Sequence, residues 1–288
     1  MNCFHQLDAL RNHLAQTPST ALVPTMGNLH QGHLTLVKRA ADVASHIVVS
    51  IYVNPTQFGP NEDLDNYPRT LAEDLQKLTA LEQELGITLS VWTPDHDVMY
   101  PFGITETTRV NVPGLSEPLC GGSRPTHFSG VATVVSKLFL QTQPAWAIFG
   151  EKDYQQLCVI RRLCQDMGFP IQIIGVPTQR DADGLALSSR NQYLSAEQRQ
   201  IAAHFPKVLQ DTKDQFSQSP ADAPSLLKNA IDELQSKGFK VDYLEIRHSN
   251  TLESIDTVKL LDSLDFRKKD WRIFGAVYLG KTRLIDNI

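Results

Sequence analysis

The segment PTMGNLHQGHL, residues 24–34, carries the two side chains best suited to phosphate chemistry. His30 and His33 form H-x-G-H between an apolar run and a helical pattern. The start of a helix offers unpaired N–H groups and the positive end of the helix dipole, which favour a phosphate. Gly27 and Gly32 permit the tight backbone of such a turn. Imidazole donors there would bind phosphate oxygens and stabilise charge as a nucleophile attacks the α-phosphorus of a nucleotide.

Two other interpretations of this segment stay open. The residues also suit a glycine turn with two ordinary surface histidines, and His-x-x-His is a spacing found in metal pairs. The position between a strand and a helix favours the phosphate interpretation. The lack of a nearby third ligand disfavours zinc.

A second segment, ALSSRNQYL, contains Ser188, Ser189 and Arg190. Hydroxyls beside a permanently charged guanidinium suit a loop that closes over a polyphosphate. By itself, such a tripeptide is more typical of a solvated turn. Together with H-x-G-H, it resembles the two-signature arrangement of nucleotidyltransferases that activate acids with ATP.

A third segment, FGEKDYQQL at 149–157, follows a predicted strand and opens a predicted helix. This places it at the carboxyl edge of the predicted sheet, where ligands of α/β proteins bind. Lys152 is suited to a phosphate and Asp153 to a ribose hydroxyl. The alternative is that Glu151 and Asp153 only complement the helix dipole.

Further polar residues complete the candidate site. Uncharged amides such as Gln57 and Gln156 suit the hydroxyls of a small substrate, and Arg124 suits a carboxylate. Each residue taken singly is more typical of an ordinary loop or helix surface. The substrate-binding candidates are Gln57, Gln156, Asn54, Tyr67, Arg124 and His127.

The elements that must position these residues follow a parallel βαβ pattern. Short apolar runs alternate with helical patterns, which predicts a Rossmann-like parallel sheet with helices on both faces. A smaller α+β domain is expected after Val176, because a Gly- and Ser-containing loop follows the last strand of the parallel pattern and leads into a helix capped by Ser195. We predict domains at 1–176 and 177–288. The expected strands are 20–24, 47–53, 88–92, 146–149 and 171–176, then 239–247 and 271–279; the expected helices are 32–44, 70–85, 129–142, 153–167, one capped by Ser195, and 222–237.

Composition excludes several classes of protein. The chain has 288 residues, 27 basic and 32 acidic, with a net charge of -5, which argues against a general nucleic-acid surface. No apolar stretch approaches the roughly 20 residues that span a bilayer, so neither export nor a membrane anchor is expected. The four cysteines form no C-x-x-C pair. We therefore expect a reduced, cytoplasmic protein without a zinc knuckle or disulfide framework.

Seven blocks in order along the chain carry a resemblance to a known family. They are PTMGNLHQGH, SIYVNPTQF, YPRT, SRPTHFSGV, FGEKDYQQL, DGLALSSRNQYL and GKTRLIDN. With them the chain resembles the pantothenate synthetase family, ATP-dependent ligases that join pantoate to β-alanine. The resemblance implies a cytoplasmic homodimer with an ATP- and pantoate-binding Rossmann-like domain and a C-terminal lid domain. It also implies a pantoyl adenylate intermediate, with pyrophosphate and then AMP released.

The resemblance also implies roles for individual residues. His33 would be the proton donor, and Gln57 would lie near β-alanine as well as pantoate. Because one anion attacks another, donors and cations must converge on the triphosphate together with Mg²⁺. The four residues expected to take part in catalysis are His33, His30, Lys152 and Arg190. The residues expected to bind ATP are Met26, Gly27, His30, His33, Gly150, Glu151, Lys152, Asp153, Gln179, Leu187, Ser188, Ser189 and Arg190. The residues that would hold a metal stay unassigned.

Small departures from the family pattern fall near the expected substrate pocket. Tyr52 and Thr56 stand where Phe and Met are frequent, and Thr126 replaces a common Gly. Thr56 and Thr126 bear on the shape of the pantoate or β-alanine pocket. Two other functions remain open: another nucleotidyltransferase of the same fold, and a catalytically silent nucleotide-binding protein.

Overall fold

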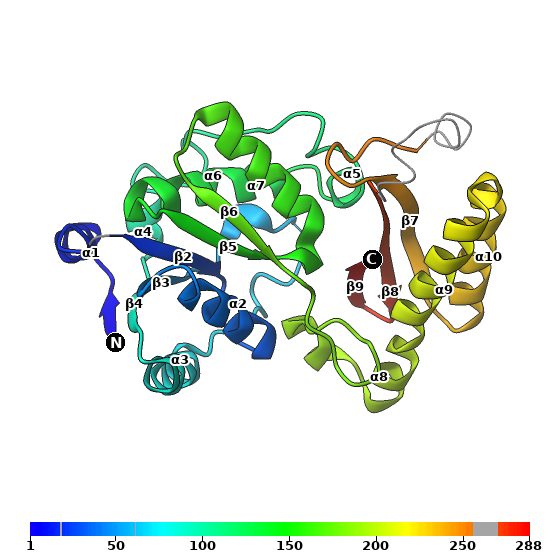
Figure 1. Cartoon of the computed structure of the whole chain (residues 1–288), viewed down its shortest axis with the longest axis horizontal. Coiled ribbons are helices and arrows are strands. Elements are labelled where there is room, and N and C mark those ends of the chain that lie inside the picture. Colours follow the sequence, from blue (N-terminus) through cyan, green and yellow to red (C-terminus); the bar gives the residue numbers. More distant parts are fainter. Residues whose placement is uncertain (18, 61, 256–269) are drawn as a thin grey trace. The chain divides into compact units, whose positions relative to one another are not determined.

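The computed structural model describes residues 1–17, 19–60, 62–255 and 270–288. The chain forms two compact units (Figure 1). The first consists of Met1–Glu117, Gly121–Glu151 and Gln156–Pro177, and the second of Pro118–Cys120, Lys152–Gln155 and Thr178–Ile288. Two short pieces of the N-terminal sequence therefore belong to the C-terminal unit. The domain boundary at 176/177 stays a prediction.

The strands and helices have the following bounds. The first sheet contains β1 Asn2–Phe4, β2 Thr20–Thr25, β3 His46–Ile51, β4 Thr88–Trp92, β5 Trp146–Gly150 and β6 Gln172–Val176, and the second contains β7 Lys240–His248, β8 Trp271–Leu279 and β9 Thr282–Asn287. The helices are α1 Leu7–Leu14, α2 Gln31–Ala41, α3 Leu71–Leu85, α4 His96–Met99, α5 Cys120–Ser123, α6 His127–Thr142, α7 Tyr154–Met167, α8 Ala196–Ala202, α9 His204–Gln218 and α10 Ala223–Ser236. Short 3₁₀ helices cover Pro55–Gln57, Glu151–Asp153, Ser189–Tyr193 and Pro220–Asp222.

The first sheet is parallel throughout and has the order β1-β4-β3-β2-β5-β6. From β2 the chain runs outward through β3 and β4, then returns to the other side of β2 with β5 and β6. The order therefore reverses between β2 and β5. In open α/β sheets a ligand binds at such a reversal, beyond the carboxyl ends of the strands.

The two strands at the reversal are paired only over their first halves. β2 and β5 are registered at Ala21↔Trp146 and Leu22↔Ala147. Pro24 follows in β2 and has no N–H to donate to a neighbouring strand. At their carboxyl ends β2 and β5 are therefore no longer joined by the ladder.

Helices cover both faces of this sheet, so its central strands are buried on both sides. Ile47, Val48 and Val49 of β3 are fully buried. The apolar faces of α2 and α3 pack on one side of the strands, and Figure 1 shows α6 and α7 on the other. The predicted Rossmann-like sheet is confirmed, with each of its five predicted strands present.

The second sheet is antiparallel, in the order β7-β8-β9, and packs against α9 and α10. The predicted cap of α8 is confirmed, because Ser195 Oγ accepts from Gln198 N and Ser195 N donates to Gln198 Oε1. The sequence did not predict β1, β9 or the helices α1, α4, α5 and α9. β1 has only three residues, and the polar residues of β9 hid its strand pattern. The smaller α+β unit is confirmed.

Candidate functional site

The turn after β2 begins at Met26 and has an unusual backbone. Gly27 has φ +80° and Asn28 has φ +49°, a region that glycine tolerates and asparagine enters at low cost. A Cβ on Gly27 would lie 3.1 Å from Ile51 Cγ2 and 3.2 Å from Asp74 Oδ2. Position 27 therefore needs glycine for both its conformation and its space.

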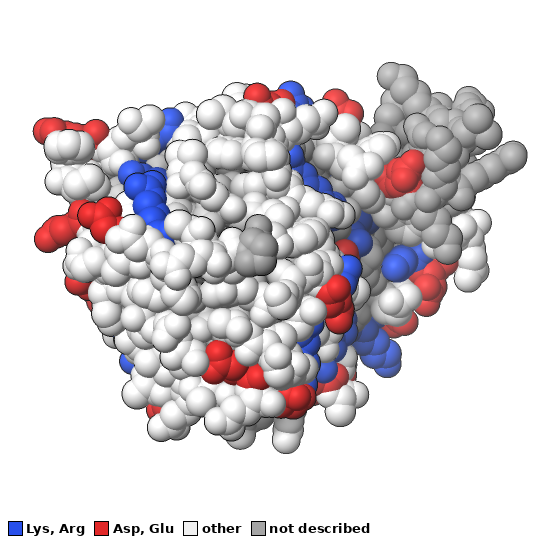
Figure 2. Space-filling model, turned by 60° about the vertical axis from the view of Figure 1, so that its left-hand side comes forward, with Lys and Arg blue, Asp and Glu red and all other residues white. Residues whose placement is uncertain are grey.

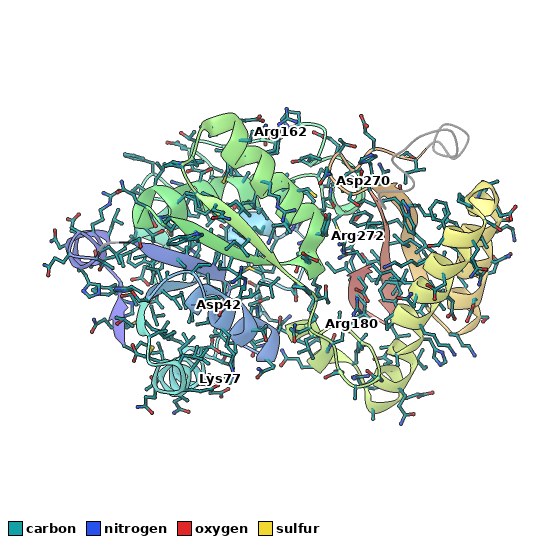
Figure 3. The ribbon with its side chains drawn as sticks, in the orientation of Figure 1. Asp42, Lys77, Arg162, Arg180, Asp270 and Arg272 are labelled. Carbon is teal, nitrogen blue, oxygen red and sulfur yellow. The ribbon has the colours of Figure 1, made fainter. Side chains whose placement is uncertain are left out.

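A buried carboxylate holds this turn in place. Asp74, which is fully buried on α3, accepts from Asn28 N at 2.8 Å and from Leu29 N at 2.7 Å, one bond to each oxygen. Lys77, labelled on α3 in Figure 3, donates to Leu29 O at 2.8 Å. Charge-assisted bonds of this kind are stronger than neutral ones. The turn is thus fixed by side chains some 45 residues away in sequence.

The two histidines of H-x-G-H cap α2 reciprocally. His30 Nδ1 accepts from Gly32 N at 3.1 Å, and His33 Nδ1 accepts from His30 N at 3.3 Å. Their ring centroids are 4.1 Å apart. Because a backbone N–H can only donate, both Nδ1 atoms must be unprotonated, and each neutral ring carries its proton on Nε2. Both rings therefore have the tautomer in which Nε2 is a hydrogen-bond donor.

The turn after β3 presents buried amides. Asn54 and Gln57 are 1% and 9% exposed, and Asn54 Nδ2 donates to Gln57 Oε1 at 3.0 Å and to Gly130 O at 3.2 Å. A Cβ on Gly130 would overlap the carbonyl oxygen of Thr56, so α6 approaches this turn closely. Asn54 and Gln57, both predicted to bind substrate, are thus joined to each other by a direct bond.

Arg124 and His127 hold the backbone of Gln57. Arg124 NH2 donates to Gln57 O at 3.0 Å, and His127 Nδ1 lies 2.8 Å from the same oxygen. Arg124 also forms a two-point ion pair with Glu62, with both bonds at 2.6 Å. Burial acts to raise the pKa of Glu62, but the bonds and charge of Arg124 outweigh it and hold that pKa below its usual value. The structure thus gives Arg124 a carboxylate partner within the chain.

The two remaining substrate candidates differ in exposure. Tyr67 is 5% exposed, and its ring meets Phe58 edge-on at 5.7 Å. Gln156, on α7, is partly exposed, whereas its neighbour Gln155 is buried and binds Cys120 N and Pro118 O. Gln155 is thus committed to the chain, which is in keeping with Gln156 as the substrate candidate.

β5 ends at the other side of the sheet reversal, with Gly150, and Glu151 follows. A Cβ on Gly175 of β6 would lie 3.0 Å from Glu151 Oε1. The Glu151 side chain therefore lies over the neighbouring strand. Gly150 has no heavy atom within 4 Å of an added Cβ, so sterics do not require glycine there.

Lys152 and Asp153 belong to the second unit, where β9 holds their backbone. Asn287 Nδ2 donates to Lys152 O at 2.9 Å, and Arg272 NH1 donates to Asn287 Oδ1 at 2.6 Å. The Arg272 guanidinium, labelled in Figure 3, lies 4.0 Å from the ring centroid of Tyr154. Lys152 Nζ is 3.8 Å from Asp153 Oδ2. The turn that carries the predicted ATP lysine is thus attached to the end of β9.

The Ser188–Arg190 segment follows a turn tied to the same strand end. Arg180, labelled in Figure 3, binds both oxygens of Asp286 at 2.6 and 2.8 Å. Leu187 N donates to Gln179 O at 2.9 Å, and Arg190 N donates to Ser188 Oγ at 3.3 Å. Asp286 and Asn287 are consecutive, so in the second unit the structure brings together the supports of both predicted ATP segments.

Three positioning residues carried no role in the sequence prediction: Asp74, Asp286 and Asn287. The last two lie in GKTRLIDN, a block that carried the family resemblance without an assigned chemistry. Asp74 lies in the first turn of α3, where an acidic residue normally only complements the dipole. No local signal distinguishes it from its exposed neighbour Glu73.

Surface charge is mixed on the face shown in Figure 2, where basic and acidic side chains are interspersed among uncharged ones. Among the described residues, no group of three or more His, Cys, Asp or Glu side chains is arranged to hold a metal ion. Within the same residues, no helix combines the length and apolar character needed to cross a membrane.

The fold and the turn at the sheet reversal define an open α/β protein of the nucleotide-binding type, with H-x-G-H at the end of its first central strand. The chain belongs to the pantoate–β-alanine ligase family, whose family model matches residues 2–288. The resemblance predicted from the sequence blocks is confirmed.

Individual relatives agree with this family over the whole chain. The pantothenate synthetase of Idiomarina loihiensis is 48% identical over 288 residues, covering 100% of this chain and 97% of the relative. The pantothenate synthetase structure from Thermus thermophilus has a TM-score of 0.85 at 42% identity, covering 100% and 99% of the two chains. The pantoate–β-alanine ligase from Francisella tularensis, solved with β-γ ATP and β-alanine, has a TM-score of 0.81 at 34% identity, covering 100% and 97%.

Proposed function

We propose that this chain joins pantoate to β-alanine at the expense of ATP, through a pantoyl adenylate. The observation that carries the proposal is the family match over residues 2–288. The H-x-G-H turn supports it, because the turn stands at the sheet reversal with both Nε2 atoms protonated. The Francisella structure was solved with β-γ ATP and β-alanine, which correspond to the nucleotide and the amine of the proposed reaction.

In the first half-reaction, a carboxylate oxygen of pantoate attacks the α-phosphorus of ATP. The bond from that phosphorus to the bridging oxygen breaks, and pyrophosphate leaves. His30 and His33 donate from Nε2 to phosphate oxygens as negative charge builds on them. Lys152 and Arg190 supply positive charge to the departing pyrophosphate. No strong base is required, because the attacking carboxylate is already ionised.

In the second half-reaction, the neutral amine of β-alanine attacks the acyl carbon of the adenylate. The acyl–oxygen bond breaks, AMP leaves, and the nitrogen loses a proton to give the amide of pantothenate. We assign Gln57 and Gln156 to the hydroxyls of pantoate, with Asn54, Tyr67, Arg124 and His127 around them. The remaining predicted ATP contacts are Met26, Gly27, Gly150, Glu151, Asp153, Gln179, Leu187, Ser188 and Ser189.

Three further properties form part of the same proposal. ATP enters as its Mg²⁺ complex, in which the metal would offset part of the negative charge of the phosphates. The chain works as a homodimer, and it does so in the cytoplasm. The need for Mg²⁺ is tested by loss of activity with a chelator and recovery with added Mg²⁺. The homodimer is tested by the mass of the protein in solution.

Pyrophosphate–ATP isotope exchange tests the adenylate. We expect exchange that requires pantoate and does not require β-alanine, followed by release of AMP and pantothenate when β-alanine is added. A stable nucleotide-linked product would instead indicate another nucleotidyltransferase. Absence of both exchange and AMP formation with pantoate would contradict the proposal.

A further inference from the structure

The turn after β3 contains a hydrogen-bond network centred on the side chain of Asn54, and the hydroxyls of Thr56 and Tyr100 in it also lie 3.4 Å from each other. Asn54 Oδ1 receives three hydrogens: from Tyr100 OH at 2.7 Å, Thr56 Oγ1 at 3.0 Å and Thr56 N at 3.4 Å. Its Nδ2 donates to Gln57 Oε1 and to Gly130 O. All the polar atoms of the Asn54 side chain are therefore engaged within the chain.

Backbone groups decide the orientation of the Asn54 amide. The carbonyl of Gly130 can only accept, and the N–H of Thr56 can only donate. A reversed amide would place Oδ1 against the Gly130 carbonyl and Nδ2 against the Thr56 N–H. Because Asn54 is 1% exposed, water does not compensate such mismatches. The hydroxyl of Tyr100 makes the shortest bond to Oδ1 and strengthens the observed orientation.

The orientation of Asn54 in turn fixes that of Gln57. Since Asn54 Nδ2 donates to Gln57 Oε1, the oxygen of the Gln57 amide faces the protein interior. Gln57 Nε2, which carries two hydrogens, is then the end that remains for a substrate. The site consequently offers a donor at this point and selects a substrate oxygen that accepts.

Tyr100 lies 46 residues from Asn54 in sequence and is 3% exposed. Burial raises the pKa of Tyr100 above its usual value, which keeps its hydroxyl protonated as a donor. Thr56 adds a second hydroxyl, and it is one of the positions at which this chain departs from the family pattern. A methionine side chain there would provide no hydrogen for Asn54 Oδ1, and of residue 56 only the backbone N–H would still donate to it.

We propose that Tyr100 and Thr56 are positioning residues that act through Asn54 to orient the Gln57 amide, so that Nε2 donates to an acceptor oxygen of the acid substrate. The inference rests on the proposed function for the identity of that acid. In this proposal Asn54 holds Gln57, whereas the sequence analysis predicted that Asn54 contacts the substrate. The orientation itself is a property of the protein alone.

The kinetic test compares Tyr100→Phe with Tyr52→Phe. Tyr52 is another buried tyrosine, and its ring centroid lies 6.4 Å from that of Tyr100, but its hydroxyl lies 2.8 Å from His96 Nδ1 instead of bonding to Asn54. We expect Tyr100→Phe to raise the KM for pantoate by about three- to tenfold, the usual range for one buried hydrogen bond, with the KM for ATP within about twofold of wild type. Thr56→Val should act in the same direction, and Thr56→Ser should restore the wild-type KM. Equal effects of the two tyrosine variants on pantoate, or an equal rise in the KM for ATP, would overturn the proposal.

A second measurement needs no substrate. In protein labelled with ¹⁵N at Asn and Gln, the hydrogens on Asn54 Nδ2 should exchange slowly in wild type and Tyr52→Phe, and several-fold faster in Tyr100→Phe. Thermal unfolding confirms that each variant is folded. If exchange responds as expected but wild-type protein shows no pantoate-dependent reaction, the proposed function fails while the orienting network stands. Unchanged hydrogen exchange at Asn54 Nδ2 in Tyr100→Phe would show that Tyr100 does not hold Asn54, which would overturn the proposal.

Discussion

The two predicted phosphate-binding segments are held by different kinds of interaction. The H-x-G-H turn is fixed by the carboxylate of Asp74, which is fully buried, and by the two imidazoles themselves. The turn before Ser188 is held by ion pairs, of which Arg180–Asp286 is 27% and 2% exposed and Arg199–Asp183 is 32% and 40% exposed. Buried charge-assisted bonds to backbone resist water and salt, whereas exposed ion pairs contribute little. The first segment therefore depends on buried bonds to its backbone, and the second depends on partly exposed ion pairs.

The largest effect is expected at the first segment itself. His33→Ala removes both a proposed donor to phosphate and the acceptor for His30 N, so we expect adenylation to fall by a factor on the order of 10² or more. Exchange of pyrophosphate into ATP measures this step. Gln31→Ala, at the exposed position between the histidines, should stay near wild type. Near-normal turnover by the His33 variant would show that its role is misassigned.

The support of the first segment should matter almost as much. Asp74→Asn replaces one acceptor oxygen with an NH₂ that faces a backbone N–H of Asn28 or Leu29. We expect kcat/KM to fall by about 10- to 100-fold and the free energy of unfolding to fall by about 2 kcal/mol.

Glu73→Gln provides the control for Asp74. It removes the same charge from the same first turn of α3 at an exposed position. Urea unfolding and steady-state kinetics should separate the two variants clearly. If both lose activity equally, the charge of the turn matters and the two backbone bonds do not.

A smaller and more selective effect is expected at the second segment. Asp286→Asn weakens the two-point bond to Arg180, which should raise the KM for ATP by about tenfold, equivalent to about 1.4 kcal/mol. The KM for pantoate should change little. The matched control is Asp232→Asn, which breaks an exposed ion pair with Lys228 on α10. Equal increases for both substrates would contradict the division between the two segments.

The smallest effect concerns pH. The hydrogen bond from Arg199 holds the pKa of Asp183 below its usual value. A lowered folded-state pKa means that Asp183 contributes stability above its unfolded value of about 3.9, and that this contribution is lost as the pH falls through the folded-state pKa. Wild type and Asp183→Asn should therefore differ slightly in urea unfolding at pH 7, and the difference should shrink as the pH falls below about 3.9 toward the folded-state pKa. A difference that grows on acidification would contradict this assignment.

Much of the fold was open to prediction from local patterns. The continuous apolar runs of the first sheet and the Ser195 capping box involve only residues that are neighbours in the sequence, so they could be predicted from the sequence. The side chains of H-x-G-H likewise form bonds within a single turn. β9 was missed because its polar side chains serve partners far away in sequence, and such contacts leave no periodic signal.

The chemical types at the site, the family and the succession of strands along the chain could all be read from the residues in order. Folding was needed to establish which end of the Gln57 amide faces outward, which nitrogen of His30 and His33 carries the proton, and that Arg124 binds Glu62. Hydrogen bonds and ion pairs are directional, so they depend on where each partner is placed. Among the bonds that support the site, the partners lie up to 135 residues apart, as in Asn287–Lys152, and such partners meet only when the chain is folded.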